Sequence, residues 1–340
     1  MIIIATGKAV PPRRVSNSEL AQKIDTSDEW IRSHTGIGSR YIAGGETACS
    51  DLALEAARAA LSMAIERGTV PEKTPEELAL TVDMIILATT TADYIGTPST
   101  ACIVQDKLGA RNAGAMDLTA ACSGFIYGLE IAAGLLATAA ERRRILVIGS
   151  ELISRITDWN DRSTCVLFGD GAGAALVEKS AGERPGRRGL LRTILGADGS
   201  GAEDLIIRRG GTRNPYRAGE TVDMPLHVEM NGRGIYNFAV KRATETIEGL
   251  LKAEGITIDD IDRIIPHQAN ARIVAAVGKR LGIPEEKFFL NIEEYANTSA
   301  ASIPIALDEL NRKGELREGS LIMTIGFGGG LTYGGNLIRW

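Results

Sequence analysis

The sequence predicts an α/β fold in which helices cover both faces of the sheets. Short, almost continuously apolar runs of strand length, such as Val82–Ala88 and Ile145–Gly149, alternate with stretches of helical length. Strands that are apolar on both faces are typical of sheets buried between helix layers. The order of these elements also repeats in the second half of the chain, which indicates an internal duplication.

The first half alternates clearly from residue 82 onward. After the strand Val82–Ala88, a helix is expected over Pro98–Leu108, because Pro lies in its first turn and Gly109 follows its end. The next elements are a short strand, a helix rich in Ala and Leu, a buried strand and a Gly-rich strand, over Ala113–Leu118, Phe125–Ala140, Ile145–Gly149 and Phe168–Val177.

The second half follows the same scheme. Its expected helices and strands cover Ile235–Ala253, Arg263–Ile265, Ala271–Leu281, Ala301–Leu310, Leu321–Ile325 and the Gly-rich Phe327–Ile338. A small-residue turn opens an apolar helix at matching places, in Ala121–Leu129 and in Asn297–Leu307. We therefore expect two related halves, residues 1–180 and 181–340, joined through the polar segment Ser180–Arg188.

Composition excludes several classes of protein. The 340 residues are 44% hydrophobic and 24% charged, which is ordinary for a globular chain with a sizeable core. A net charge of −5 disfavours a dedicated nucleic-acid-binding protein. The apolar stretch Ile131–Ala140 is about half the length of a membrane-spanning helix, and Met1–Ala5 is too short for a signal sequence. We expect neither nucleic acid nor membrane as a partner.

Four cysteines are too few for a disulfide framework and indicate a reduced, cytoplasmic protein. Cys122 stands out, because it lies between a predicted strand and the start of a helix, where the helix dipole and free N–H groups favour a thiolate. A buried structural thiol is the alternative. We expect the others in the core, with Cys49 and Cys102 at helix starts and Cys165 in a strand.

Three further motifs could complete a site with Cys122. His267 follows a predicted strand end in PHQAN, a place suited to proton transfer or to binding an oxyanion. Asn297 opens NTSAAS, either as a helix cap or as an amide donor. The glycines after Phe327 let a backbone approach a ligand closely, and they lack the Lys-Ser/Thr and the spacing of phosphate-binding loops.

In this order, TAACSGF around Cys122, PHQAN around His267, NTSAAS from Asn297 and the terminal GFGGGLTYG resemble one family. The chain resembles β-ketoacyl-acyl-carrier-protein synthase III of type II fatty acid synthesis, within the thiolase superfamily. The likeness runs from TSDEWI at Thr26 to Arg339. It implies a thiolase-like fold, in which two βαβαβαββ halves stack in five αβαβα layers, usually in a homodimer.

The resemblance also implies a decarboxylative Claisen condensation. Cys122 would take the acyl group of an acyl-CoA primer such as acetyl-CoA. Malonyl-acyl carrier protein would lose CO₂ and attack this group, giving 3-oxoacyl-acyl carrier protein. His267 and Asn297 would donate hydrogen bonds to the malonyl thioester oxygen, and the amides of Cys122 and Gly329 would form an oxyanion hole. Phe327 would flank the thiol, and neither a metal nor a redox cofactor is implied.

The resemblance assigns a second group of residues to CoA. Its CoA-binding positions are Trp30, Arg162, Thr26 and Asn270, of which Trp30 and Arg162 would enclose the adenine. His34 departs from the family, which usually has an arginine four residues after the tryptophan. Thr26 and Glu29 also have the spacing of a capping box, so part of this motif is a helix start.

Basic residues on the helix predicted over 271–281 match the family's docking positions for the acidic carrier protein. Arg272 and Lys279 lie about 20° apart around the helix axis, and Arg280 lies about 80° further on. A solvated helix face is the alternative. Thr97 stands where some members have a phenylalanine that closes the acyl pocket across the dimer, so we predict a longer or branched primer.

Three other functions stay open. Cys, His and Asn in this order also describe papain-like proteases, although their CGSCW-type motif and disulfide cysteines are missing here. A divergent relative in secondary metabolism would use the same three residues on unusual acyl groups. A non-enzymatic interaction protein is disfavoured, because all three reactive residues and the glycine loop are present.

Overall fold

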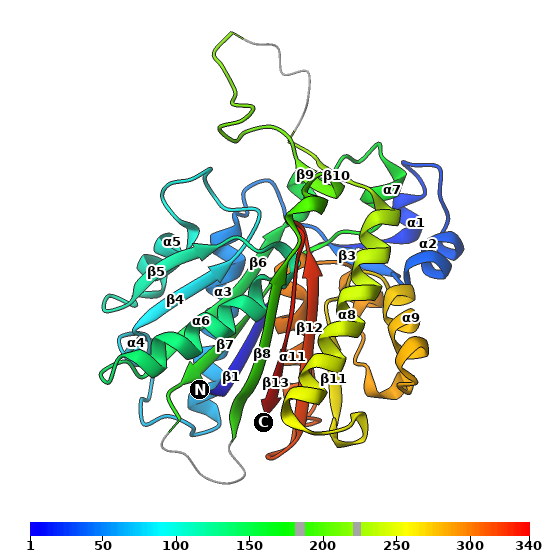
Figure 1. The fold of residues 1–340 in the computed structure, drawn as a ribbon. Coiled ribbons are helices and arrows are strands. Elements are labelled where there is room, and N and C mark those ends of the chain that lie inside the picture. The colour runs from blue at the N-terminus through cyan, green and yellow to red at the C-terminus, as the bar shows by residue number, and fades with distance from the viewer. Residues whose placement is uncertain (181–187, 220–225) are drawn as a thin grey trace.

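The computed structural model describes residues 1–180, 188–219 and 226–340. Two sheets are stacked with helices between them and on both outer faces (Figure 1). This arrangement confirms the predicted five-layer, thiolase-like α/β fold. The proposed division near residue 180 stays a prediction, because residues 181–187 of the expected join lie outside the described residues.

The first sheet has the strand order β1-β7-β6-β4-β5. These strands are Ile2–Ala9, Asp170–Glu178, Arg144–Leu152, Met84–Ala88 and Gly114–Leu118. β4 pairs in parallel with β5 and β6, whereas β7 is antiparallel to both β6 and β1.

The second sheet repeats this pattern with one strand fewer. Its order is β11-β12-β13-β8, with bounds Arg263–Pro266, Leu321–Gly328, Thr332–Arg339 and Gly189–Ala197. β11 and β12 are parallel, and β13 is antiparallel to β12 and β8. A single bridge from Phe288 to Ile264 stands where the first sheet has its fifth strand.

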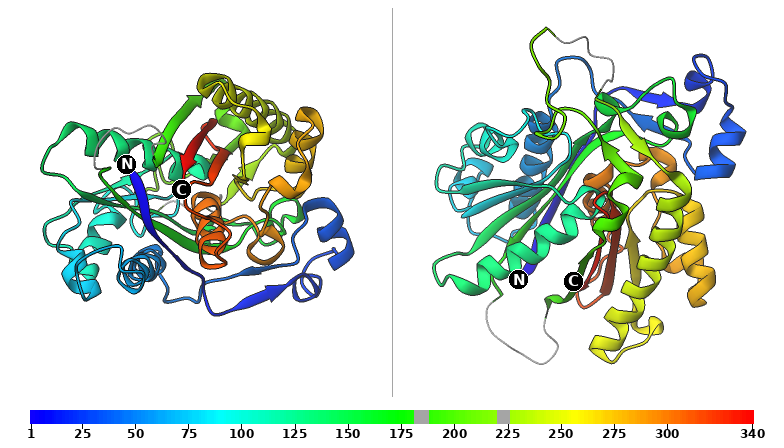
Figure 2. Two further views of the ribbon diagram at one scale, coloured as in Figure 1. Left: turned by 90° about the horizontal axis from the view of Figure 1, so that it is seen from below. Right: turned by 45° about the horizontal axis from the view of Figure 1, so that its top comes forward.

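Three pairs of helices form the helical layers, as the turned views also show (Figure 2). α3 (Cys49–Glu66) and α5 (Thr100–Leu108) cover the first sheet, and α8 (Gly232–Glu254) and α9 (Ala271–Leu281) cover the second. α6 (Gly124–Thr138) and α11 (Ser302–Arg312) lie between the sheets. One apolar cluster lies at each of the three helix layers, and the burial of these clusters stabilises the fold.

One end of the molecule carries the smaller elements. An insertion after β1 holds β2 (Arg14–Ser16), α1 (Asn17–Leu20), α2 (Asp28–Thr35) and β3 (Ser39–Tyr41). The ribbon shows this insertion at the same end as α7 and the β9–β10 hairpin (Figure 1). The remaining elements are α4 (Pro75–Ala79), α7 (Arg162–Cys165), α10 (Ile292–Tyr295), β9 (Leu205–Ile207), β10 (Val228–Met230), and the 3₁₀ turns η1 (Ala121–Ser123), η2 (Ile153–Ile156), η3 (Gly199–Asp204), η4 (Ile258–Asp260), η5 (Glu285–Lys287) and η6 (Ser299–Ala301).

Two helix starts differ from the sequence prediction for the same reason. α5 begins at Thr100, because the Ser99 hydroxyl accepts from the Cys102 amide and caps the helix. α2 is capped by Ser27, whose hydroxyl accepts from the Trp30 amide, and the expected capping box at Thr26 is not formed. In both cases the neighbouring hydroxyl reaches the free N–H of the first turn.

Two cysteine predictions were wrong. Cys102 is exposed, because its helix turns it outward from the core. Cys165 is buried as expected but ends the short helix α7 and not a strand. Cys49 is buried at the start of α3, as predicted.

One stretch, Ala121–Thr138, is long and apolar enough to cross a membrane by length and composition. It consists of η1 and α6, and half of it is buried inside the protein. Because α6 packs against strands of both sheets, the apolar residues of this stretch are explained by the central layer.

The two halves meet where small residues allow backbone contact. η1 of the first half contacts η6 of the second. A Cβ on Gly149 of β6 would overlap the backbone oxygen of Ala300 in η6, and a Cβ on Gly124 would lie 2.8 Å from that of Ala88. Only glycine therefore fits at these places.

We expect Gly149→Ala to lower the free energy of unfolding by about 3 kcal/mol, the upper part of the range for overpacking, since the obstructing atom is backbone. Denaturant unfolding measures this change. The matched control is Gly134→Ala in α6, where a Cβ meets open space, and it should stabilise by about 0.5–1 kcal/mol. Equal stability of the two variants would contradict the proposed close contact.

Candidate active site

Cys122 lies in η1, between the end of β5 and the start of α6. The preceding residue, Ala121, has a positive φ of 45°, which is unusual for a residue with a side chain. Cys122 is 8% exposed, and its thiol donates a hydrogen bond to the Ser299 hydroxyl over 3.4 Å. The thiol of the first half thus touches a residue of the second half directly.

The expected thiolate is wrong for the resting site. Burial raises the pKa of Cys122 to about 12, and this effect outweighs the hydrogen bond with Ser299, which lowers the pKa. The thiol is therefore protonated at neutral pH, and attack on a substrate requires that its proton moves to another group.

His267 follows β11 directly, and its amide donates to the Ile325 carbonyl of β12 at 2.7 Å. The side chain is buried, and burial lowers its pKa to about 3, so the imidazole is neutral at physiological pH. Nδ1 lies 2.7 Å from the Ser302 hydroxyl, which donates to the Ser299 carbonyl at 2.9 Å. The direction in which Ser302 donates decides which ring nitrogen holds the proton.

Asn297 is held by the first half of the chain. Its amide donates to the Leu167 carbonyl at 2.9 Å, and its carbonyl accepts from Gly169 at 3.0 Å. The side-chain oxygen Oδ1 accepts from the Ser299 amide at 2.8 Å. This contact orients the side chain, so that Nδ2 remains the donor end, and the residue lines the cavity described below.

The glycine loop between β12 and β13 passes directly beside the thiol. A Cβ on Gly328 would lie 2.6 Å from the Cys122 backbone nitrogen, so a larger residue would displace the nucleophile. Gly329 is the next residue and lines the cavity together with Cys122. This proximity brings both amides of the expected oxyanion hole to the same wall.

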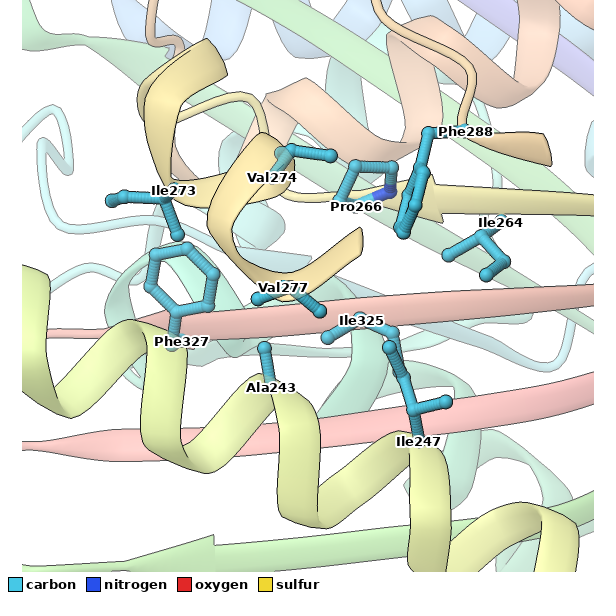
Figure 3. A pocket seen from close by; sticks show the side chains of 10 residues that line it. All are labelled: Ala243, Ile247, Ile264, Pro266, Ile273, Val274, Val277, Phe288, Ile325 and Phe327. Carbon is cyan, nitrogen blue, oxygen red and sulfur yellow. The ribbon is translucent and has the colours of Figure 1, made fainter. Parts of the chain in front are cut away.

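Phe327 separates the cavity from the apolar core. Its ring lies edge-on to His267, with 5.4 Å between the ring centroids. On its other side is a small apolar void of about 10 Å³ beneath α8 and α9, whose lining side chains include Ile273 and Val277 (Figure 3). Phe327 therefore excludes water from one side of the reactive groups.

The three candidate catalytic residues open onto one cavity of about 960 Å³. Its apolar wall comes partly from the β9–β10 hairpin, through Leu205, Ile206, Ile207, Val228 and Met230. Cavities of this size are within the ordinary range for small-molecule sites. Among the described residues, no group of three or more His, Cys, Asp or Glu side chains is placed to hold a metal ion.

The expected CoA residues lie near one another at the end of the molecule that carries α2 and α7. Trp30 stacks on His34 with 4.4 Å between centroids, and the Arg162 guanidinium lies 4.9 Å from the Trp30 ring centre. Asn270 caps α9 and donates to the His34 carbonyl. Trp30, His34 and Asn270 line the cavity, whereas Arg162 and Thr26 do not.

The basic residues predicted for carrier docking are all exposed on α9. Arg272 lies in the first turn and lines the cavity, and Lys279 and Arg280 lie in the last turn. Thr97 is exposed and does not line the cavity of its own chain.

Comparisons with known proteins agree on one family. The models of 3-oxoacyl-[acyl-carrier-protein] synthase III and of its C-terminal region match residues 116–199 and 251–340. A β-ketoacyl-[acyl-carrier-protein] synthase III of Natranaerobius thermophilus is 49% identical over 340 residues, covering 99% of this chain and 98% of that protein. That of Caldanaerobacter subterraneus subsp. tengcongensis is 47% identical over 339 residues, covering 99% and 97%. The chain belongs to the synthase III family.

Solved structures agree with this family membership. The 3-oxoacyl-[acyl-carrier-protein] synthase III of Aquifex aeolicus VF5 is 42% identical, with a TM-score of 0.87 over 100% of this chain and 99% of that one. The priming β-ketosynthase of the R1128 polyketide pathway is 34% identical, with a TM-score of 0.88 over 99% and 95%. Xanthomonas campestris OleA, at 21% identity, shares the fold, with a TM-score of 0.81 over 100% and 98%.

The sequence analysis overlooked three residues of this synthase III site. Ser299 and Ser302 were quoted within NTSAAS but given no role, and both contact candidate catalytic side chains. Glu151 is completely buried. A single carboxylate directly after the apolar run ILVIGS could have revealed it, since buried charges without partners are rare.

Proposed function

We propose that this synthase III family member performs its condensation at Cys122, His267 and Asn297. The reaction joins an acyl-CoA primer to malonyl-acyl carrier protein and initiates type II fatty acid synthesis. The observation that carries the assignment is that a thiol, a neutral imidazole and an oriented amide from both halves of the chain line one cavity.

In the first step, Cys122 attacks the thioester carbon of acyl-CoA. The carbon–sulfur bond to CoA breaks and an acyl-Cys122 thioester of similar energy forms, so the step is reversible. The amides of Cys122 and Gly329 stabilise the tetrahedral oxyanion. The Trp30–Arg162 pair, with Thr26 and Asn270 nearby, binds the nucleotide end of CoA.

In the second step, the malonyl group loses CO₂, and its carbanion attacks acyl-Cys122. Negative charge builds on the malonyl thioester oxygen, which accepts hydrogen bonds from Asn297 Nδ2 and His267 Nε2. This step requires the ring proton on Nε2, and the Ser302 hydroxyl secures it when its proton turns from the Ser299 carbonyl to Nδ1. No metal or redox cofactor takes part in this scheme.

We expect Cys122→Ala to abolish the acyl-enzyme seen by intact mass after incubation with acetyl-CoA. Asn297→Asp should still form it, but should lose condensation about 10²–10³-fold, because a carboxylate oxygen replaces a hydrogen-bond donor. Asn112→Asp, at an exposed position that does not line the cavity, is the matched control. A Cys122→Ala enzyme with full condensing activity would refute the mechanism, and a papain-like hydrolase would retain no stable acyl group.

Carrier protein docks, in this proposal, on Arg272, Lys279 and Arg280, because the carrier is acidic and Arg272 adjoins the cavity. Reversing the charge at Arg272 and Lys279 should raise the KM for malonyl-acyl carrier protein and leave acylation by acyl-CoA unchanged. Lys73→Glu, near α4, is the matched control. An unchanged KM in the double variant would contradict docking on this face.

A homodimer in the cytoplasm completes the proposal. The described cysteines are free, as a reducing compartment requires. Tyr94 and Ile95, which are 57% and 71% exposed, lie beside Thr97 and offer an apolar contact for a second copy. Thr97 would then border the acyl pocket of that copy.

The second candidate is the priming of a secondary pathway with a longer or branched acyl group. Both the small residue Thr97 and the likeness to a polyketide priming synthase favour it. We expect condensation rates across an acyl-CoA panel to favour primers longer than acetyl, and Thr97→Phe to shift the preference toward acetyl. A wild-type enzyme that prefers acetyl-CoA by a wide margin would contradict this candidate.

A further inference from the structure

Glu151 is a completely buried carboxylate at the end of β6. It accepts hydrogen bonds from the Thr90 amide and hydroxyl at 3.0–3.2 Å and from the Thr91 hydroxyl at 2.7 Å. The Thr89 hydroxyl donates at 3.3 Å. Burial raises the pKa of this carboxyl above its usual value, and the hydrogen bonds from Thr91 and Thr90 offset only part of that rise.

No cation in the described part of the chain forms an ion pair with this carboxylate. The titratable groups that interact with it are Cys122 and Cys49. Burial raises the pKa of Cys49 to about 12, so Cys49 carries no charge at neutral pH. An unpaired buried charge costs several kcal/mol, and this cost makes Glu151 a better proton acceptor than an exposed carboxylate.

Ser299 connects Glu151 to the nucleophile. The Cys122 thiol donates to the Ser299 hydroxyl over 3.4 Å, and the Ser299 hydroxyl also hydrogen-bonds the Glu151 carboxylate, which opposes the rise in the Glu151 pKa that burial causes. Ser299 has a positive φ of 48°. Such a conformation costs about 1–3 kcal/mol in a residue with a side chain, and here it holds the hydroxyl between the two groups.

We propose that Glu151 is the resting acceptor of the Cys122 proton, with Ser299 as the bridge between them. The S–H bond of Cys122 breaks as its proton passes to Ser299 Oγ, and the Ser299 proton passes to a Glu151 oxygen. The pair keeps one negative charge throughout, now on sulfur. When the thiolate displaces CoA, the leaving CoA thiolate takes up the proton that Glu151 held.

His267 is the other candidate acceptor, and the geometry and burial disfavour it. The described hydrogen bond of the thiol goes to Ser299 and not to the imidazole. A proton on His267 would create an imidazolium in a site where burial lowers its pKa to about 3. Transfer to Glu151 only moves one buried charge from the carboxylate to sulfur, whereas transfer to neutral His267 would create two buried charges, so the first transfer costs less.

The test measures alkylation of Cys122 by iodoacetamide between pH 6 and 8, with peptide mass mapping. Because the pair shares one proton, the thiolate fraction and the rate should stay nearly constant over this range. Glu151→Gln removes the acceptor, so alkylation of Cys122 in this variant should speed up about tenfold per pH unit. At pH 7 it should be at least about tenfold slower than in the wild type. Cys102, which is exposed, reports the intrinsic reactivity of the reagent in the same digest.

The direction in which Glu151→Gln changes the alkylation rate distinguishes an effect of the Glu151 charge from proton transfer. If Glu151 acted only through its charge, Glu151→Gln would remove repulsion and speed alkylation at pH 7. Either that acceleration or a flat profile in Glu151→Gln overturns the proposal. A tenfold-per-unit slope in the wild type overturns it as well, whatever the folding of the variant. A flat profile that is lost in His267→Ala, but kept in Glu151→Gln, assigns the proton to His267 and refutes the relay.

Two more variants separate a relay from structural support. Ser299→Ala keeps the acceptor but removes the hydrogen bond to the thiolate, so the profile should stay flat at a rate about tenfold lower. Glu151→Asp should also keep a flat profile. Asp170→Asn neutralises another completely buried carboxyl, bonded to Ser154 and the Ala43 amide, and should leave the profile unchanged.

The proposal rests on Cys122 being the nucleophile, yet alkylation needs no substrate. A failed relay therefore leaves acyl-enzyme formation intact, whereas a failed assignment of Cys122 would appear in the intact-mass experiment. The two results can be told apart.

Discussion

The contact between η1 and η6 is the constraint on which the rest of the site depends. Each half supplies a turn that opens a central helix, and η6 packs closely on the first half because Gly149 carries no side chain. The contact places Cys122 against Ser299 and fixes Asn297 on backbone groups of the first half. Neither half can form this site alone, because the thiol comes from one half and the imidazole and amide from the other.

Burial sets the charge state of the site. The thiol and the imidazole are both kept neutral at physiological pH, since the low-dielectric surroundings raise the pKa of Cys122 and lower that of His267. A neutral imidazole suits a hydrogen-bond donor to a developing oxyanion. It does not suit a proton acceptor, which leaves Glu151, whose pKa is raised by burial, as the proposed acceptor of the thiol proton.

Sequence signals correctly predicted those features that depend on residues close together in the chain, such as the ends of a helix. α9 has the predicted bounds, because Asn270 caps its start and Gly282 its end, and both signals lie within the helix itself. The outward turn of Cys102 and the protonated state of Cys122 could not be read in this way, since both depend on which elements pack around the residue. The residue that caps α2 is Ser27 and not Thr26. Both are hydroxyl residues and they are adjacent in the sequence, so a spacing rule does not distinguish them.

The position of α9 links the two substrates of the proposed reaction. Arg272 lines the same cavity as Trp30 and His34, so the basic face proposed for the carrier protein adjoins the place proposed for CoA. Two thioesters that enter by neighbouring routes cannot both occupy the apolar wall beside Cys122. A covalent acyl-Cys122 resolves the conflict, because CoA can leave before the malonyl group arrives. A resting thiol that stays protonated until a thioester is bound is less reactive, which would protect the nucleophile while the site holds no substrate.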